Sequence, residues 1–393
     1  MLELNFLEQF DTVLAAAWRS EARFDLGQAG LRFRLVRRAA LTSADQAAWQ
    51  RLTDAAQAVS PFADHWFMKA ALQHCDNAAE ASLAIVADDA GEWLGVLPVA
   101  RKPWRGKAPL PNWVAWQHPN QFVGTPLLRT GQAEIFWRAL LAGLEAEPGS
   151  ELAFCVPRMP DDDQITHALL EACIADGREF EIEAFHSRPG LRSGGAIASP
   201  PQQQRRIAGL ERKLNRELGQ PRFAASRDPE RIADMIDELL KLEASGWKGR
   251  RGSALASSAG TASLFREVAL AGAAAGKFEV ATLHVGERLL AFSTILIGSA
   301  RWYGFKSAYD ENAARYGPGV LLLDWITRRF SELSPALSFD SCSASGQQPV
   351  SRLWSGELGL ADYRISLGGP IRHRALQAIR VGEAAYSWLK RSV

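Results

Sequence analysis

Residues 299–330 read SARWYGFKSAYDENAARYGPGVLLLDWITRRF, and this stretch decides the fold. It opens with β-favouring residues around Trp302 to Phe305, which predict a strand. A polar loop over 310–314 leads to the turn Arg-Tyr-Gly-Pro-Gly at 315–319. From Val320 the apolar residues recur at helical spacing, so we expect strand, loop, glycine-bearing turn and helix in succession.

The turn at 315–319 has the features of a phosphate-binding element. Pro318 suits the first turn of a helix, and Gly317 and Gly319 remove side chains there. We expect free backbone N–H groups at the positive end of the helix dipole, with the cation of Arg315 beside them. The alternative is a plain loop closure, because Gly-Pro-Gly before a helix is common. The glycine spacing matches neither a Walker loop nor a dinucleotide fingerprint.

Composition narrows the classes of protein. The 393 residues are enough for two domains, and 45 basic against 44 acidic residues argue against bulk nucleic-acid binding. The four cysteines form no metal-ligand spacing, so we expect reduced thiols and no metal. The start MLELNFLEQF is acidic, and no run of 18 apolar residues occurs. We therefore expect a cytoplasmic protein, with peripheral contact at the inner membrane left open.

The same order of elements is predicted twice along the chain. After an opening helix at 4–20, the first half reads strand 31–39, helix from a Ser43/Gln46 capping box, helix 63–75, hairpin 81–87 and 93–100, strand 112–116, helix 132–145 and strand 152–156. The second half reads strand 222–225, helix from Asp228 to near Gly246, helix 261–275, hairpin 278–284 and 289–297, the stretch above, and strand 336–341. Few residues are identical between the halves, so the repeat rests on pattern.

This order, with Trp247-Lys248-Gly249, Tyr309-Asp310, the 315–319 turn and Phe339-Asp340, resembles the GNAT acyltransferase fold. It is more closely similar to the two-repeat CelD/BcsL acetyltransferases of cellulose biosynthesis, and distantly to the Fem aminoacyltransferases. The resemblance covers residues 60–365 and implies an α/β (α+β) fold. It implies tandem GNAT-like repeats, each a mixed, mostly antiparallel sheet flanked by helices. Tyr-Gly-Pro-Gly after Arg315 departs from the usual Gln/Arg-x-x-Gly-x-Gly/Ala loop.

The halves are expected to differ in function. The first has Gln121 to Pro126 where the second has its turn, without paired glycines or an adjacent cation. We therefore expect a degenerate repeat at 1–195, an acyl-CoA-binding GNAT domain at 196–370 and a basic amphipathic helix at 371–393. The segment 188–204, rich in Gly, Pro, Ser and Gln, reads as a linker or an ordered loop.

The resemblance implies acyl-CoA, acetyl or longer, as co-substrate, with the thioester carbonyl met by a backbone N–H near 306–308. For the base we favour Asp310, which lies just past the strand; the alternative is a turn or cap residue. Tyr309 or Tyr316 could reprotonate the leaving thiolate, or could simply pack. Lys306 could contact phosphate or acceptor, or could face solvent. The cofactor-binding residues are expected to be Arg315, Gly317, Gly319, Val320 and Leu321.

Trp247 and Lys248 are candidates for substrate binding. A tryptophan among basic residues suits an anionic acceptor or the CoA 3′-phosphate, although a charged loop is the simpler interpretation. His284 and Cys342 are disfavoured as base and nucleophile, because each lacks a partner nearby in sequence.

The predicted function is acyl transfer from acyl-CoA to an amine or hydroxyl of an envelope-related acceptor. A lipid amine such as a sphingoid base, or a sugar, would fit. A non-catalytic accessory role in exopolysaccharide or envelope biosynthesis is the alternative. A Fem-type transferase using aminoacyl-tRNA would need more basic surface than the cluster Arg205, Arg206, Arg212, Lys213 and Arg216.

The predicted C-terminal helix gives a hint about whether the acceptor is a lipid. One predicted face carries Leu376, Ile379, Tyr386, Leu389 and Val393, with basic residues around it. Such a helix can lie on anionic lipid, or it can pack on the second domain with its arginines in solvent.

Overall fold

The computed structural model describes residues 19–26, 29–56, 60–103, 110–193, 200–343, 348–369, 372, 374–379 and 381. They belong to two compact units. Unit 1 takes residues 1–57, 77–185 and 360–393, and unit 2 takes residues 58–76 and 186–359. Each unit therefore contains a segment from the other half of the chain. Nearly all of the predicted opening helix, 4–18, lies outside the described residues, which begin with a strand that was not predicted.

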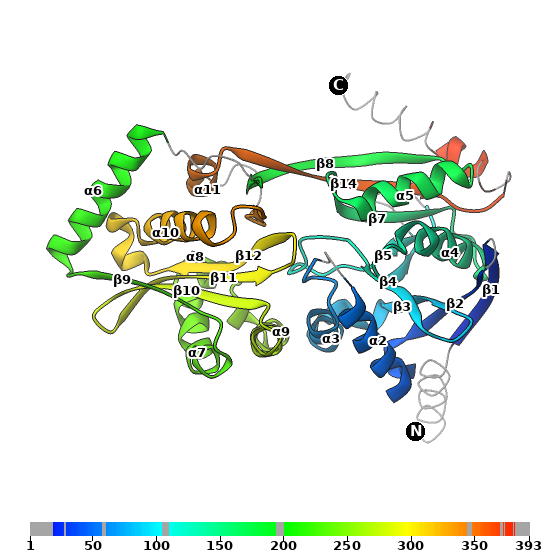
Figure 1. The fold of residues 1–393 in the computed structure, drawn as a ribbon, viewed down its shortest axis with the longest axis horizontal. Coiled ribbons are helices and arrows are strands. Elements are labelled where there is room, and N and C mark those ends of the chain that lie inside the picture. The colour runs from blue at the N-terminus through cyan, green and yellow to red at the C-terminus, as the bar shows by residue number, and fades with distance from the viewer. Residues whose placement is uncertain are drawn as a thin grey trace, which may run out of the picture. The chain divides into compact units, whose positions relative to one another are not determined.

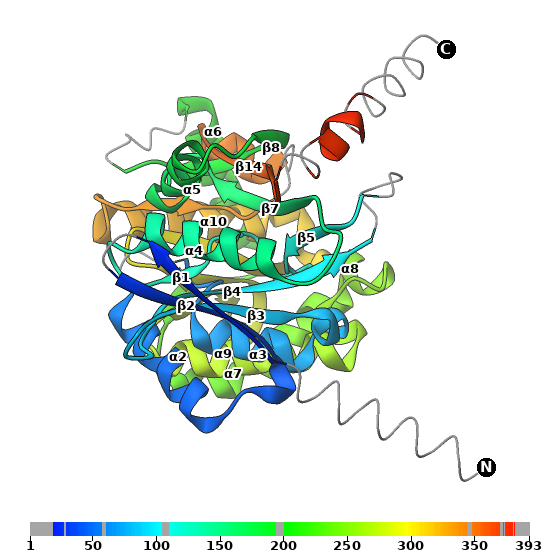
Figure 2. The ribbon, with the colours of Figure 1, turned by 90° about the vertical axis from the view of Figure 1, so that its right-hand side faces the viewer.

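Unit 1 is built on one mixed sheet. Its elements are β1 (Arg19–Leu26), β2 (Ala29–Arg37), η1 (Arg38–Ala40), α2 (Ser43–Ala55), η2 (Asp76–Glu80, from Asn77 on), β3 (Ser82–Asp88), β4 (Trp93–Lys102), β5 (Asn112–Ala115), β6 (Leu127–Leu128), α4 (Ala133–Ala146), β7 (Ala153–Pro160), α5 (Gln164–Ala175), and parts of β8 (Phe180–Leu191) and β14 (Gly356–Ser366). The strand order is β1-β2-β3-β4-β5-β7-β14, antiparallel except between β5 and β7. Helices α4 and α5 lie on one face and α2 on the other (Figure 2).

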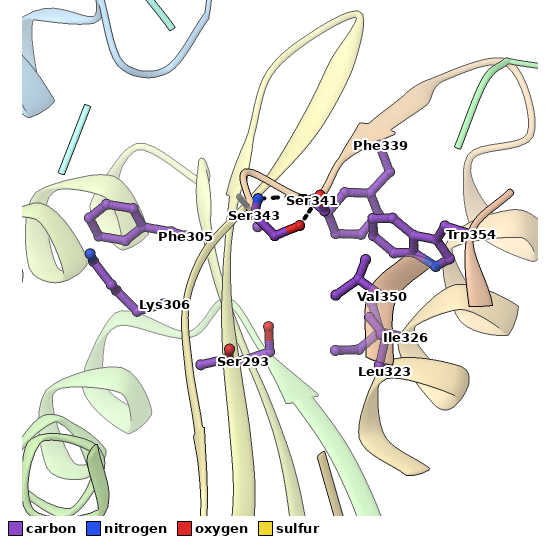
Figure 3. Close-up of a pocket in the computed structure, with 12 residues that line it drawn as sticks. Ser293, Phe305, Lys306, Leu323, Ile326, Phe339, Ser341, Ser343, Val350 and Trp354 are labelled. Atoms are coloured by element: carbon purple, nitrogen blue, oxygen red, sulfur yellow. Dashed lines mark hydrogen bonds between the residues drawn. The ribbon is translucent and has the colours of Figure 1, made fainter. Parts of the chain in front are cut away.

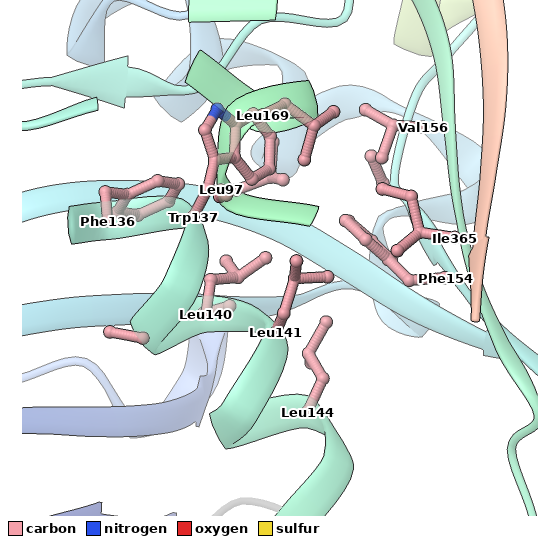
Figure 4. Close-up of a cluster of buried hydrophobic side chains, with 14 of the residues drawn as sticks. Leu97, Phe136, Trp137, Leu140, Leu141, Leu144, Phe154, Val156, Leu169 and Ile365 are labelled. Atoms are coloured by element: carbon pink, nitrogen blue, oxygen red, sulfur yellow. The ribbon is translucent and has the colours of Figure 1, made fainter. Parts of the chain in front are cut away.

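The core of unit 1 lies between α4 and the sheet. Helix α4 directs Trp137, Leu140 and Leu141 toward Phe154 of β7 and Ile365 of β14 (Figure 4). All five side chains are fully buried, and each contributes roughly 1.5–3 kcal/mol by leaving water. This packing joins β14, from the end of the chain, to the sheet of the first half.

Helix α2 begins with a capping box, but not with the predicted residues. The Asp45 N–H donates to Thr42 Oγ1 at 3.2 Å, and the Thr42 N–H donates to Asp45 Oδ2 at 2.9 Å. The Ser43/Gln46 prediction is therefore wrong by one residue. Asp45 also pairs with Arg34 of β2 at 2.9 Å, which ties the helix start to the sheet.

Unit 2 is built on a second mixed sheet. Its elements are α3 (His65–His74), the end of β8, α6 (Pro201–Glu217), β9 (Pro221–Ser226), α7 (Pro229–Ser245), α8 (Trp247–Arg250), η3 (Leu255–Ser257), α9 (Ala259–Ala274), β10 (Phe278–Val285), β11 (Arg288–Ile297), β12 (Arg301–Tyr309), η4 (Glu311–Tyr316), α10 (Pro318–Leu333), β13 (Ser338–Asp340), α11 (Gln348–Leu353) and the start of β14. The order β9-β10-β11-β12-β13-β8 is antiparallel except between β12 and β13. Helix α10 lies on one face, α7 and α9 on the other (Figure 1).

The two units repeat one plan, which confirms the predicted fold class of mixed, mostly antiparallel sheets flanked by helices. In each, a strand, helices, an antiparallel hairpin, a strand, a helix and a parallel closing strand follow in order. The parallel pair even repeats its residues: Trp113 pairs with Phe154 in unit 1, and Trp302 pairs with Phe339 in unit 2. The strand pairing therefore shows that both units have a Trp–Phe pair at the same position, which the sequence alone did not reveal.

The segment 58–76 supplies part of the unit 2 core beside β12. The ring of Phe62 lies 5.6 Å from that of Tyr303, and Phe67 lies 5.8 Å from Phe305. Lys277 Nζ binds buried Asp64 Oδ2 at 2.8 Å, which anchors the segment below α9 and β10. Strand β12 is thus held by residues far away in sequence.

Several elements were not predicted, among them β1, α5, β8, α6 and β14. The segment 188–204, predicted as a linker or an ordered loop, contains the end of β8 and the start of α6. Strand β8 continues to Leu191 and α6 starts at Pro201. The cationic residues at 205–216 therefore lie on a helix.

The described part of the C-terminal segment packs on unit 1. Leu376 is buried with Leu110 and Ala153, and Ile379 packs against them. Arg372 Nη2 donates to Gly149 O at 3.0 Å. Residues 382–393, with the rest of the predicted amphipathic face, lie outside the described residues. Within the described residues, no helix is both long enough and apolar enough to cross a membrane.

A buried ion pair fixes the end of β13. Arg188 of β8 donates to Asp340 Oδ2, and both side chains are almost fully buried. Removing one partner of such a pair leaves an uncompensated charge, which typically costs about 3–5 kcal/mol.

We expect Asp340→Leu to lower the free energy of unfolding by about that amount. The double variant Arg188→Met/Asp340→Leu should lose clearly less than Asp340→Leu alone, because no unpaired charge remains. Urea denaturation of both variants measures this. Losses that simply add would show that the pair is not what holds β13.

Candidate functional site

The site forms where β12 and β13 separate. The strands pair in parallel at Arg301 with Ser338, Trp302 with Phe339, and Tyr303 with Asp340. Beyond that point β12 continues along β11 to Tyr309, while β13 ends. A Cβ added at Gly304 would lie 2.8 Å from Ser341 O, so this close approach requires glycine. After Gly304, no described strand pairs with this edge of β12.

A pocket of about 100 Å³ lies at this opening (Figure 3). Leu323 and Ile326 of α10 form its apolar side, together with Val350 and Trp354. Its polar lining comes from Ser293, Ser341 and Ser343, and the last two hydroxyls lie 2.8 Å apart. The pocket can therefore take a small, mostly apolar group next to strand edges.

A β-bulge directs two neighbouring side chains of β12 to the same side. The register with β11 shifts between Thr294 and Ile295, opposite Lys306 and Gly304. Thr294 Oγ1 accepts from the Lys306 N–H at 2.9 Å and donates to Lys306 O at 3.1 Å. Phe305 and Lys306 both lie across β12 from Leu323 and Ile326 (Figure 3). The side chain of Lys306 thus faces α7 and α8, although its residue lines the pocket.

The surroundings of Lys306 lower the pKa of its amine to about 8. Burial is the main cause and the nearby charge of Lys248 adds to it, while Glu243 opposes both. Lys306 Nζ lies 5.2 Å from the centre of the Phe305 ring. An amine with this pKa changes protonation near neutral pH, as an acid–base group must.

Glu243 was missed in the sequence. It is buried at the end of α7, with Oε1 accepting from Lys248 Nζ at 2.7 Å and Oε2 from the Leu255 N–H at 2.8 Å. Lys248 Nζ also donates to Ser307 O at 2.9 Å. A signal was present, since Glu243 continues the apolar face of Ile236, Leu239 and Leu240. Lys248 therefore joins α7 to β12, and its charge is largely neutralised by Glu243.

Helix α8 is attached to the end of β12 through Glu311. The Trp247 N–H donates to Glu311 Oε1 at 2.6 Å, and Arg250 Nη2 donates to Oε2 at 2.7 Å. The Trp247 side chain stays 45% exposed, with the Arg251 guanidinium 5.4 Å from its ring. The structure thus brings the two predicted substrate residues, Trp247 and Lys248, to the same side of β12 as Lys306.

The turn before α10 has one strained position. Gly317 has φ +62°, a left-handed conformation that favours glycine, and an added Cβ would also meet Leu210 at 2.9 Å. The amides of Val320 and Leu321 both donate to Gly317 O, at 2.9 and 3.0 Å. These two amides are therefore satisfied by Gly317 O, and the cofactor-binding role predicted for Val320 and Leu321 stays a prediction. Among the described residues of this first turn, the Gly319 N–H makes no hydrogen bond.

Two of the three predicted catalytic residues around this turn, Asp310 and Tyr316, are hydrogen-bonded to neighbouring side chains or backbone. Asp310 caps η4 by accepting from the Asn312 N–H at 2.9 Å, and its other oxygen binds Arg288. Tyr309 is 37% exposed, and its ring lies 3.4 Å from where a Cβ on Gly319 would be. Tyr316 is buried and its hydroxyl accepts from Arg315. The catalytic roles predicted for these residues stay predictions.

The equivalent opening in unit 1 is filled by the chain itself. Strands β5 and β7 pair only from Asn112 to Val114, and residues 117–124 follow β7 from there. Gln117 Nε2 donates to Pro157 O at 3.0 Å, and the Gly124 N–H donates to Arg158 O at 3.0 Å. An added Cβ at Gly124 would lie 1.9 Å from Pro157 O. In unit 1 the chain that follows β5 therefore lies along the edge of β7, the strand that corresponds to β13 of unit 2.

Comparisons with known proteins agree with this geometry. A comparison with curated proteins found no match. A conserved protein of unknown function from Bacteroides thetaiotaomicron superposes with a TM-score of 0.50 at 15% identity, over 84% of this chain and 98% of that one. The C-terminal domain of a protein described as a lysylphosphatidylglycerol synthetase, from Agrobacterium fabrum, gives 0.53 at 12% identity, over 86% and 97%. FemX gives 0.48 at 12% identity, over 80% and 95%.

The first two of these structures show a shared fold. The sequence match is more specific, because it covers the elements that build the opening and the turn, from α6 to the residues after β13. Residues 202–342 match the family model described as "Acetyltransferase (GNAT) domain".

Proposed function

We propose that the protein is an acyl-CoA-dependent acyltransferase of the two-repeat CelD/BcsL type. It would transfer an acyl group to an amine or hydroxyl of an envelope-related acceptor. The observation that carries the proposal is the open edge of β12 beside the pocket. An extended amide-containing arm can add to an exposed strand edge as a peptide strand does, and the pantetheine arm of CoA is such a chain.

The pocket favours a short acyl group. An apolar cavity of about 150 Å³ admits benzene. A pocket of about 100 Å³ therefore has room for an acetyl group and not for a long acyl chain. We accordingly narrow the co-substrate from any acyl-CoA to acetyl-CoA.

The two substrates would reach the reaction from opposite sides of β12. The pocket lies toward α10, and Lys306 with Trp247 and Lys248 lies toward α8. The acceptor would approach on the α8 side, where exposed Trp247 can stack against a sugar ring or an apolar chain. An acceptor amine or hydroxyl would then meet the thioester through the opening next to Gly304.

Lys306 is our first choice for the acid–base group. The acceptor forms a new bond to the acyl carbon, the bond from carbon to sulfur breaks, and the acceptor proton must leave. A lysine amine with a pKa of about 8 can take that proton in its neutral form. Asp310 remains the alternative, although both its oxygens already bind donors. Tyr309 is better placed than buried Tyr316 to protonate the thiolate, because its hydroxyl is not held by Arg315.

We expect acetyl-CoA to bind once per chain, because among the described residues the opening in unit 1 is occupied by residues 117–124. Gly319→Val should abolish binding in isothermal titration calorimetry, since the branched side chain would meet Tyr309 and cover the Gly319 amide. Gly319→Ala is the matched control and should bind like wild type, because its Cβ fits at 3.4 Å. A long-chain acyl-CoA should bind no more tightly than CoA. Two sites per chain, or unchanged binding in Gly319→Val, would refute the proposal.

We expect the kcat/KM to rise with pH up to a plateau above about 8, as Lys306 loses its proton. Lys306→Met should lose about 10²–10⁴ in rate together with this pH dependence. Lys248→Met should move the rise to higher pH, because Lys248 is one cause of the lowered pKa. If Asp310→Asn loses the rate while Lys306→Met keeps it, the base is Asp310.

A lipid-borne acceptor is favoured by the basic C-terminal sequence. Because Leu376 and Ile379 pack on unit 1, a membrane contact would begin near Val381, which is 71% exposed. We expect cosedimentation with anionic vesicles that falls with salt. Truncation after Val381 should abolish this vesicle binding. It keeps the buried Leu376, which removal of all residues from 371 on would delete. Equal recovery with and without vesicles would favour a water-soluble sugar or amine.

A further inference from the structure

Helix α6 lies beside the turn that precedes α10 (Figure 1). Its buried residues Ile207 and Leu214 belong to the unit 2 core. Between them, Leu210 lies against Gly317, with Cδ1 2.9 Å from the position of an added Cβ. The face of α6 that contains Leu210 is therefore fixed next to the proposed cofactor turn.

Two cations lie over one buried ring at this contact. The side chain of Lys213, one turn after Leu210, places Nζ 5.7 Å from the centre of the Tyr316 ring. The Arg315 guanidinium lies 4.7 Å from the same centre and donates to the Tyr316 hydroxyl. Tyr316 is only 1% exposed, so its ring is a rigid platform that positions both charges.

A single carboxylate lies among these cations. Glu217 binds Arg216 at 2.7 Å and Arg315 at 3.6 Å. The hydrogen bond from Arg216, followed by Tyr316 and Lys213, lowers the pKa of the Glu217 carboxyl, so it stays ionised at neutral pH. Lys213, Arg216 and Arg315 against Glu217 leave a net charge of +2, from three cations minus one anion. Solutes can reach it, since the side chains of Arg216 and Arg315 are 69% and 66% exposed.

We propose that this group, the α6 cation cluster of Lys213, Arg216, Glu217, Arg315 and Tyr316, recognises the 3′-phosphate of CoA. The inference rests on the proposed function. A phosphate monoester carries about −1.5 to −2 charges at pH 7, which matches the cluster. The 3′-phosphate is the monoester of CoA, whereas its pyrophosphate carries one charge per phosphorus. Guanidinium groups suit phosphate because two parallel N–H donors fit two oxygens.

The predicted alternative, recognition by the Trp247–Gly252 turn, is less favourable. Lys248 and Arg250 are paired with Glu243 and Glu311. In the α6 cation cluster the ion pairing is incomplete, because Lys213, Arg216 and Arg315 have only the carboxylate of Glu217 among them. The α6 cation cluster thus retains the charge that a phosphate needs.

The start of α6 supplies matched controls. With a rise of about 1.5 Å per residue, Arg205 and Arg206 lie roughly 10 Å or more before Lys213 along the helix. Both are exposed and each carries the same charge as Arg216. Removing them changes the net charge of α6 equally without touching the cluster.

The test compares the Kd of CoA with that of 3′-dephospho-CoA by calorimetry in the full chain. Wild type should bind CoA about tenfold more tightly, a difference of about 1.4 kcal/mol. Lys213→Ala/Arg216→Ala should bring this ratio near one by weakening CoA alone. Arg205→Ala/Arg206→Ala should keep it. Glu217→Gln should raise it, because the competing carboxylate charge is gone.

The outcomes separate the two proposals. Binding of neither nucleotide refutes acyl-CoA use itself. Equal Kd values for both nucleotides in wild type, or loss of the ratio in the Arg205/Arg206 variant, overturns only the role of the α6 cation cluster. A lipid monoester is tested with vesicles containing phosphatidic acid. If Lys213→Ala/Arg216→Ala loses vesicle binding but keeps the nucleotide ratio, the phosphate recognised is that of lipid and the inference fails.

Discussion

The structure of the site depends on how Asp340 is held. One oxygen of this buried carboxylate binds Arg188, and the other accepts from the Cys342 N–H at 2.8 Å. The backbone then turns at Cys342, whose φ of +51° is costly for a residue other than glycine. Strand β13 therefore cannot continue beside β12, and the opening results. The buried ion pair between Arg188 and Asp340 stabilises this strained turn. The same pair joins β13 to β8, which comes from the first half of the chain.

The two units show what happens when such an opening is kept or filled. The parallel Trp–Phe pair is the same in both, so the strands separate at equivalent points. In unit 2 the space holds a pocket. In unit 1 residues 117–124 take up the backbone groups of β7, as a bound strand would. Backbone groups next to a buried edge must find partners, so an edge that no ligand uses has to be covered by protein.

Charge placement follows from the same arrangement. Buried Glu243 holds Lys248 against β12, and the bulge opposite Thr294 turns Lys306 toward it. Two lysines beside one acid in a partly desolvated place leave one amine that is easily deprotonated. On the other side of β12, α6 and η4 collect cations over Tyr316. The proposed acid–base group and the proposed phosphate site thus lie on different sides of β12.

The sequence by itself determined the fold class, the hairpins and main helices of both repeats and the turn before α10, because periodicity, Pro318 and the glycines are local signals. It also indicated that the first half lacks this turn. It did not reveal α6, although Ile207, Leu210 and Leu214 have helical spacing, because the Pro- and Gln-rich surroundings suggested a linker. Only the tertiary structure decided which residues meet. Glu243, Lys248 and Lys306 lie far apart in the chain, and segment 58–76 and the end of β14 each join the other half's unit. Burial, ion pairing and the partners of backbone amides are properties of the folded arrangement, so no local pattern could specify them.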